Sequence, residues 1–232
     1  MRSIAFVLSI ACLLFGLKAS SEYDYYVFAT EWAGTVCRNT ACSETKGIDP
    51  NFFNIHGLWP SQHSSTYEPS NCHGPSFSDS YLTNSTMAKL KRYWSGLFNP
   101  ANDFHNHEWT KHGTCWNDDL ETKINVIEDF FQHVMNVAQD YNAHSILTQA
   151  GIVPGSVYPL QKIQTALAKA YGSMDAFVIH CQAGQLNELQ VCLDKNYKPM
   201  SCPKTTKLAL KLSGPPCGSM VGYPAIHPSL LV

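Results

Sequence analysis

The nine cysteines of this 232-residue chain constrain its fold more than any other feature of the sequence. Cys12 lies in an apolar run over residues 4–17, which follows a short basic start and precedes small residues at 19–21. The run is shorter than the roughly 20 residues that span a bilayer and is typical of a secretory signal peptide. We therefore expect residues 1–21 to be removed and the other eight cysteines to form disulfides in an oxidising compartment. Their spacing alone leaves the pairing open, because eight cysteines allow about 105 connectivities.

The charge of the mature chain limits its partners. Cleavage removes Arg2 and Lys18 and no acidic residue, so 14 basic groups face 18 acidic groups and the net charge is near −4. This composition does not supply the broad basic surface that duplex nucleic acid requires, so a polyanion would have to bind at a small local site. No second segment is long and apolar enough to span a membrane, and we expect a soluble single domain over residues 22–232.

Residue patterns predict strands toward both ends of the chain and helices in its middle. Aromatic and β-branched residues predict strands over residues 23–30, 52–58, 177–181 and 186–193. Pro60 is expected to end the second of these strands. Apolar spacing and terminal signals predict helices over residues 81–93, 105–113, 124–141 and 160–171. This order indicates an α+β fold, with a mainly antiparallel central sheet packed against several helices and stabilised by disulfides.

The segment Phe104 to Cys115 (FHNHEWTKHGTC) concentrates titratable groups and contains three of the chain's ten histidines. On a helix, Glu108 and His112 are four residues apart and share one face. His107 and Lys111 form a second such pair, one residue further round. We expect Glu108 to orient the imidazole of His112 and raise its basicity, with positive charge from Lys111 and His107 beside it.

The spacing of these histidines argues against a zinc site on the helix. The helical zinc motif H-E-x-x-H has its histidines four residues apart, whereas His107 and His112 are five apart. That spacing corresponds to about 140° around a helix, so the two rings would not converge on one ion from one face. The ammonium of Lys111 also opposes a cation. We expect neither a metal nor another cofactor.

His56 lies in a second motif, Phe53 to Pro60 (FNIHGLWP). A lone histidine in an apolar strand is usually a core residue, but a second histidine-bearing segment favours a catalytic role. Two imidazoles on opposite sides of a substrate can act as a general acid and a general base. With an ammonium and a carboxylate nearby, they suit cleavage of RNA, whose 2′-hydroxyl supplies the nucleophile. DNA lacks this hydroxyl and is expected to resist.

The two motifs together resemble the two active-site segments of the ribonuclease T2 family. Its members are secreted, endolysosomal or vacuolar endoribonucleases of broad base preference with an α+β fold. The resemblance covers residues 23–217 and rests on two multi-residue motifs in the right order, flanked by Cys72 and Cys115. It implies an endoribonuclease in the secretory or endolysosomal lumen that acts on single-stranded RNA. We expect it to act as a monomer, without a membrane or DNA partner.

The resemblance implies a role for each matching position. His112 would be the general base and His56 the general acid of the transfer step, and these roles would reverse when water opens the 2′,3′-cyclic phosphate. Glu108 and Lys111 would stabilise the transition state, and His107 would bind phosphate. The positions at which the family stacks a base correspond to Trp59, Tyr67 and Phe104.

The resemblance also implies three disulfides, Cys72–Cys115, Cys181–Cys217 and Cys192–Cys202, which leaves Cys37 and Cys42 as the fourth pair. Asn84-Ser85-Thr86 is the only N-glycosylation sequon in the sequence, so Asn84 is the expected glycan site.

Two positions depart from the family pattern. His105 stands where many members have tryptophan, a change that alters packing beside the site and removes no catalytic group. Ser61 stands where some members carry an aspartate that helps to select adenine. The resemblance therefore implies no adenine preference.

Two other classes of function fit part of the pattern. A secreted recognition protein or toxin of the same fold would depend on surface contacts, and its effect would survive His56→Ala. A disulfide-rich structural protein would use the histidines for packing, which does not explain the Glu-Lys-His register. The full set of catalytic-type residues favours an active enzyme. We expect a pH optimum near about 5, because positive neighbours lower the pKa of His112.

Overall fold

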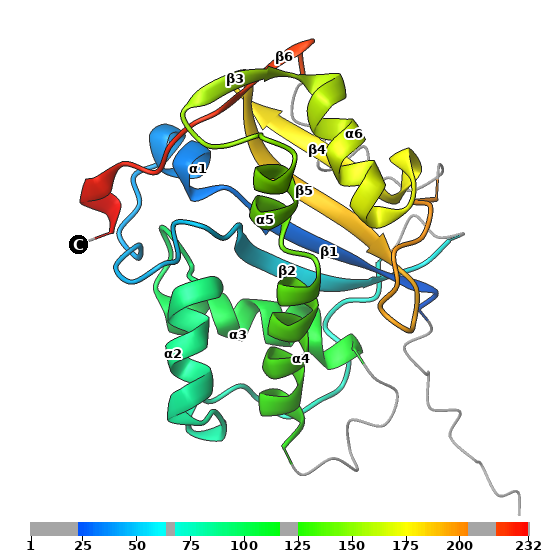
Figure 1. Ribbon diagram of the computed structural model, residues 1–232. Coiled ribbons are helices and arrows are strands. Elements are labelled where there is room, and N and C mark those ends of the chain that lie inside the picture. Colours follow the sequence, from blue (N-terminus) through cyan, green and yellow to red (C-terminus); the bar gives the residue numbers. More distant parts are fainter. Residues whose placement is uncertain (1–22, 64–67, 117–124, 204–216, 232) are drawn as a thin grey trace, which may run out of the picture.

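The computed structural model describes residues 23–63, 68–116, 125–203 and 217–231, so Tyr67 and the expected signal peptide lie outside it. Within these residues a six-stranded sheet is combined with helices in one α+β architecture (Figure 1). No helix in the described ranges has the length and apolar character needed to cross a bilayer.

The sheet has the strand order β2-β1-β5-β6-β3, and β4 also pairs with β5. β1 pairs antiparallel with β2 and β5, β4 pairs antiparallel with β5, and β3 pairs antiparallel with β6. One parallel contact joins β5 to β6. The strands span Tyr25–Glu31 (β1), Asn54–Ser61 (β2), Ser156–Pro159 (β3), Phe177–Gln182 (β4), Gln185–Leu193 (β5) and Met220–Tyr223 (β6). The predicted mainly antiparallel α+β fold is confirmed.

The helices lie on one face of the sheet and beyond its β2 edge. In Figure 1, α5 and α6 lie over the sheet, whereas α2, α3 and α4 gather next to β2. The helices span Ala33–Asn39 (α1), Asn84–Tyr93 (α2), Ala101–Lys111 (α3), Val126–Asp140 (α4), Ala143–Gln149 (α5) and Leu160–Tyr171 (α6). α6 has the bounds that the sequence predicts, and Gly172 ends it in the left-handed region at φ 82°.

Alternation along β1 divides the core into two parts. Tyr26 and Phe28 pack into the large cluster between the sheet and the helices, since side chains two residues apart share a face. Tyr25 and Val27 point the other way, into a smaller cluster that contains Trp59. Trp59 therefore enters the site from the face of the sheet opposite the main core.

The prediction that Pro60 ends the second strand is wrong. β2 continues through Pro60, which pairs with Tyr26, and ends at Ser61. β2 is an edge strand of the described sheet. A residue without an amide hydrogen is tolerated there, because one side of the strand makes no ladder bonds.

The helix that carries the titratable cluster also differs from the prediction. α3 begins at Ala101, after Pro100, and ends at Lys111 rather than at Gly113. His112 is its C-cap residue, with φ −118° and ψ −45°. His112 N still donates to Glu108 O (3.1 Å), so the two residues keep an i, i+4 backbone contact at the end of the helix.

Four disulfides link Cys37 to Cys42, Cys72 to Cys115, Cys181 to Cys217 and Cys192 to Cys202, the pairs that the resemblance implies. Cys72–Cys115 joins the segment before α2 to the turn after α3, across a sequence separation of 43 residues. A backbone hydrogen bond from Asn71 N to Lys111 O (2.9 Å) lies beside it. Both contacts fix the end of α3.

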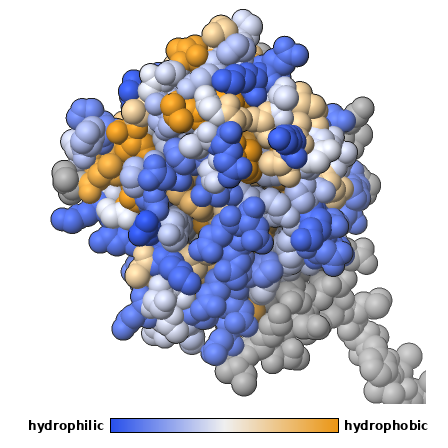
Figure 2. All heavy atoms as spheres, in the orientation of Figure 1, coloured by the Kyte–Doolittle hydropathy of each residue, from blue (hydrophilic) through white to orange (hydrophobic). Residues whose placement is uncertain are grey.

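The face seen in Figure 2 is mainly hydrophilic, and its apolar residues gather in the upper half, around β3. Val157 on β3 and Met220 on β6 are 61% and 51% exposed. This region lies away from α3 and the β2 edge, so it does not overlap the cavity described next.

Candidate active site

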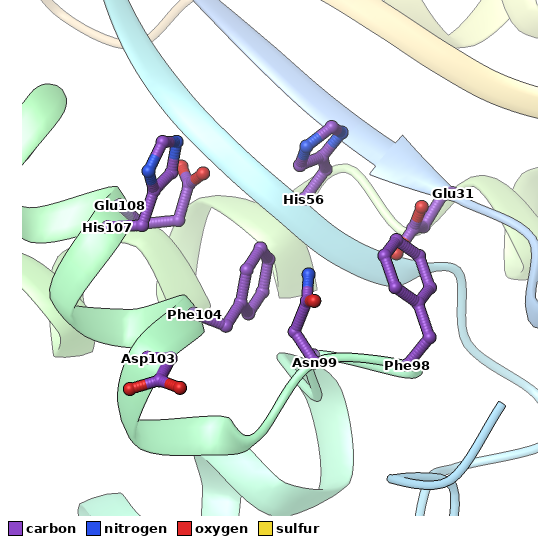
Figure 3. A pocket seen from close by; sticks show the side chains of 9 residues that line it. Glu31, His56, Phe98, Asn99, Asp103, Phe104, His107 and Glu108 are labelled. Atoms are coloured by element: carbon purple, nitrogen blue, oxygen red, sulfur yellow. The ribbon is translucent and has the colours of Figure 1, made fainter.

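A cavity of about 380 Å³ lies between β2 and α3. Figure 3 shows His56 entering it from β2, and Phe104, His107 and Glu108 entering it from α3. Glu31, at the end of β1, lines the same cavity. The structure thus brings the two sequence motifs to one cavity from separate elements.

His56 is held by a carboxylate that the motifs do not contain. Its Nδ1 lies 2.9 Å from Oε2 of Glu188 on β5. Burial lowers the pKa of His56, but the hydrogen bond to Glu188 and the negative charges of Glu31, Glu188 and Glu108 outweigh it and raise the pKa to about 9. His56 is therefore an imidazolium at neutral pH, the form required of a general acid.

His112 is shifted in the opposite direction. Its side chain is buried, and its Nδ1 has no hydrogen-bond partner within the described part of the chain. Burial, followed by the positive charges of Lys111, His107 and His56, lowers the pKa of His112 to about 2. The ring is therefore neutral at neutral pH, the form required of a general base.

The expectation that Glu108 orients His112 and raises its basicity is wrong. The side chain of Glu108 instead accepts a hydrogen bond from Trp59 Nε1 (3.1 Å). Its contact with His112 is made by the backbone, where His112 N donates to Glu108 O. A carboxylate oxygen of Glu108 and a ring nitrogen of His112 nevertheless lie within 4.8 Å of each other.

Glu108 itself is buried, at 2% exposure. Burial raises its pKa to about 7, against the opposing effects of His56, the Trp59 hydrogen bond and Lys111. At acidic pH this carboxyl is protonated and can donate a hydrogen bond to a phosphoryl oxygen. Lys111 lies close enough to influence the pKa of Glu108, His107 and His112.

The three proposed base-stacking residues differ in position. Phe104 lines the cavity, whereas Tyr67 lies outside the described residues. Trp59 is 6% exposed. The centroid of its ring lies 5.0 Å from that of His56 and 5.4 Å from that of His112. The observed role of Trp59 is to hold Glu108, and base stacking by Trp59 stays a prediction.

The geometric argument against a metal also needs correction. Donor atoms of His107, Glu108 and His112 lie within 4.8 Å of one another, although the two histidines are five residues apart. These atoms could approach a single cation. The ammonium of Lys111 still opposes one, and metal independence stays a prediction that chelation tests.

His105, the departure from the family pattern, is a buried core residue at 1% exposure. Its Nε2 donates to the backbone oxygen of Trp94 (2.7 Å), and Trp94 Nε1 in turn donates to the backbone oxygen of His56 (3.0 Å). Burial lowers the pKa of His105, so the ring is neutral. His105 supports the strand that carries His56.

Gly57 is required because the site closes tightly over it. A Cβ at this position would overlap both Glu108 Oε2 and Trp59 Nε1. We expect Gly57→Ala to displace the carboxylate or the indole, lowering kcat about 10-fold and stability by about 1–3 kcal/mol. Steady-state kinetics and thermal unfolding test this, with Gly218→Ala, where a Cβ would meet only ordinary contacts, as control. A Gly57→Ala enzyme that is indistinguishable from the control would contradict it.

A disulfide-linked α+β domain with one charged and one neutral imidazole, both packed against Trp59, is suited to acid–base catalysis. The model of the Ribonuclease T2 family matches residues 23–202, and the chain belongs to that family. Ribonuclease DdI of Dictyostelium discoideum is 30% identical over 237 residues, covering 97% of this chain and 99% of that protein. Ribonuclease 1 of Arabidopsis thaliana is 32% identical, covering 82% and 85%. The solved structure of an RNase-related protein from Calystegia sepium has a TM-score of 0.73 at 25% identity, covering 89% and 99%.

Glu31 and Glu188 are the carboxylates beside His56 that sequence reasoning missed, and it also missed four residues that line the cavity, Gly96, Phe98, Asn99 and Asp103. Neither carboxylate beside His56 belongs to a motif, and Glu188 follows His56 by 132 residues. The available signal was an acidic residue within the apolar strand pattern LNELQVCL. Such a residue is buried on one face of a strand and needs a partner there.

Proposed function

We propose that the protein is an endoribonuclease that cleaves single-stranded RNA through a 2′,3′-cyclic phosphate to 3′-phosphate ends. The observation that carries this proposal is that His56 and His112, whose rings both pack against Trp59, have pKa values shifted in opposite directions. Transfer needs a neutral base for the 2′-hydroxyl and a charged acid for the leaving 5′-oxygen. The substrate supplies the nucleophile, and no free thiol is needed.

In the first step, His112 takes the proton of the 2′-hydroxyl as this oxygen attacks phosphorus. His56 gives a proton to the 5′-oxygen as its bond to phosphorus breaks. In the second step, His56 is neutral and activates water, and His112 returns its proton to the 2′-oxygen. Lys111 and protonated Glu108 stabilise charge on the phosphoryl oxygens, and the exposed His107 binds phosphate.

The cavity also accounts for low base specificity. Phe98 and Phe104 both line it, and aromatic faces stack on any base. We propose that one base of the RNA enters beside Phe104 while the phosphate lies between His56 and His112. The alternative of a recognition protein with incidental catalysis is not favoured, since the complete acid–base site is formed.

The rate of cleavage is expected to fall as pH rises through about 9, where His56 loses its proton. On the acid side it should fall when His112 becomes protonated. The pKa of His112 is about 2 in the free site, so the optimum of kcat/KM lies between the two pKa values, in the acid range. A profile of kcat/KM against pH measures both limbs. Activity confined to pH above about 8 would contradict the assignment.

Digestion of RNA homopolymers and of single-stranded DNA, each with and without EDTA, tests the proposed function. We expect cleavage of all four RNA homopolymers, no cleavage of DNA, and no effect of EDTA. Loss of activity in EDTA would instead point to a cation bound by His107, Glu108 and His112. Cleavage of DNA would exclude the 2′-hydroxyl as nucleophile.

We further propose that the chain enters the secretory pathway through residues 1–21 and acts in an oxidising lumen or outside the cell, as a single domain and a monomer. The four disulfides support this. Similar ribonucleases of Solanum lycopersicum include one named extracellular and one named intracellular, so similarity does not select the final compartment. Detection of the chain in culture medium, or in lysosomal or vacuolar fractions, would identify that compartment.

Asn84 is exposed at the start of α2 and is the proposed glycan site. Thr86 of the same sequon is buried, and its hydroxyl donates to Glu128 Oε1 (2.6 Å). A glycan would therefore have to be added before α2 packs on α4. A mass shift on deglycosylation that is absent in Asn84→Gln tests this.

A further inference from the structure

Glu188 lies in a row of polar side chains that crosses three strands of the sheet. It is directly opposite Glu31 of β1 on one side and His180 of β4 on the other. Directly opposite residues of antiparallel strands share a face. His56 reaches this row from β2, with its Nδ1 2.9 Å from Glu188 Oε2. The second oxygen of Glu188 accepts from Gln190 Nε2 at 2.5 Å, so both oxygens are engaged.

We propose that Glu188 is a positioning residue for catalysis, which orients His56 as the general acid by accepting a hydrogen bond from its Nδ1–H. With Nδ1 occupied, Nε2 is the ring nitrogen left to face the leaving oxygen of the substrate. The same contact stabilises the imidazolium over the neutral ring, as a buried carboxylate does for a catalytic histidine. This inference rests on the proposed function, because it assigns a partner to the acid of that reaction.

Of the two facing carboxyls, Glu188 ionises more readily than Glu31. Burial raises the pKa of Glu188, but the hydrogen bond and charge of His56, Gln190 and His180 lower it below its ordinary value. Burial and the charge of Glu188 raise the pKa of Glu31, against the opposing effects of His56 and Asn54. Two facing carboxylates cannot both ionise without cost, and the one bonded to His56 is ionised.

Other charged groups face His56 from the opposite wall of the cavity. On α3 these are Asp103, Glu108, whose charge raises the pKa of His56, and His107, which is exposed. His112 follows at the end of the same helix and is neutral. Glu188 is the one member of the described surroundings with a hydrogen bond to the His56 ring. Removing its charge should therefore lower the pKa of His56.

The test compares Glu188→Gln with the wild type on two substrates. A dinucleoside monophosphate has a poor leaving group, the 5′-hydroxyl, and needs the acid. A uridine 3′-(4-nitrophenyl phosphate) has a leaving group that departs without a proton. If Glu188 acts through the acid, Glu188→Gln loses about 10- to 100-fold in kcat on the first substrate and less than about 2-fold on the second. The alkaline limb of the pH–rate profile of Glu188→Gln on the first substrate should also move to lower pH.

Three controls make the outcome specific. Glu44→Gln removes an exposed carboxylate and should change neither substrate's rate nor the pH limb. His56→Ala should show the same dependence on leaving group as Glu188→Gln, only larger, and thermal unfolding shows whether each variant folds. If Glu188→Gln does not fold, Glu188→Asp is measured on the same two substrates, and its shorter side chain should give the same dependence.

The outcomes separate the inference from the proposed function. Equal losses on both substrates, or no loss and an unmoved alkaline limb, would overturn the role of Glu188. If His56→Ala itself fails to distinguish the two substrates, the acid assignment and the proposed function are wrong. If His56→Ala distinguishes them and Glu188→Gln does not, only the inference about Glu188 is wrong.

Discussion

Replacement of His112 or of His56 by alanine is expected to lower kcat on single-stranded RNA by about 10³-fold or more, near the upper range for loss of a general acid or base. Each variant removes one proton carrier at the cavity and leaves the other in place. The effect on kcat should exceed that on KM, since neither proton transfer occurs in the ground state. Steady-state kinetics on a dinucleoside monophosphate measure it.

His227→Ala is the matched control for these variants. His227 is an exposed histidine whose Nδ1 contacts Ser229 near the C-terminal end of the described chain, away from the cavity. It should retain wild-type kinetics. Thermal unfolding and disulfide content establish that the catalytic variants are folded. Near-normal turnover by a folded His56→Ala or His112→Ala enzyme would contradict the assignment of that residue.

Removal of the Cys72–Cys115 disulfide is expected to lower the free energy of unfolding by roughly 4 kcal/mol, from the closure entropy of a loop of 43 residues. Activity should fall as well, because this bridge and the Asn71–Lys111 backbone bond hold the end of α3, where Lys111 and His112 lie. The measurement is denaturant unfolding of Cys72→Ser/Cys115→Ser together with its kinetics.

The comparison variant is Cys37→Ser/Cys42→Ser. That disulfide closes a separation of only 5 residues, so its loss should cost roughly 2 kcal/mol. Neither cysteine lines the cavity, and kcat should be kept where the variant is folded. Equal or reversed losses of stability would show that closure entropy is not the main contribution. Full activity of the Cys72→Ser/Cys115→Ser enzyme would show that the end of α3 does not need the bridge.

The surroundings, rather than the residue type, assign acid and base in this site. His56 and His112 share an ordinary pKa of about 6.5. His56 is hydrogen-bonded to a carboxylate, which raises its pKa to about 9. His112 is buried among positive charges, and its pKa is lowered to about 2. This separation gives each residue the protonation state that its role requires.

The sequence predicted the fold class and brought the two catalytic segments together, because both are contiguous motifs with characteristic spacing. It failed where a property depends on packing between distant segments. Glu188 reaches His56 only because β5 pairs with β1, and β1 with β2. The Glu108 carboxylate accepts from Trp59 rather than from His112 only because β2 packs beside α3.

Short elements were missed for a related reason. α1, α5, β3 and β6 have only 4 to 7 residues each, too few to show a period of their own. They form because their neighbours in the sheet or core supply the pairing. Pro60 is a similar case, since its tolerance depends on β2 being an edge strand.

The measurement that tests the central claim most directly is ³¹P NMR of a dinucleoside monophosphate during cleavage in the presence of EDTA. Two-step acid–base catalysis by His56 and His112 predicts that a 2′,3′-cyclic phosphate appears first and is converted to a 3′-phosphate. It also predicts that the 2′-deoxy analogue stays intact. A 5′-phosphate product, direct formation of the 3′-phosphate without the cyclic species, or loss of cleavage in EDTA would contradict the mechanism.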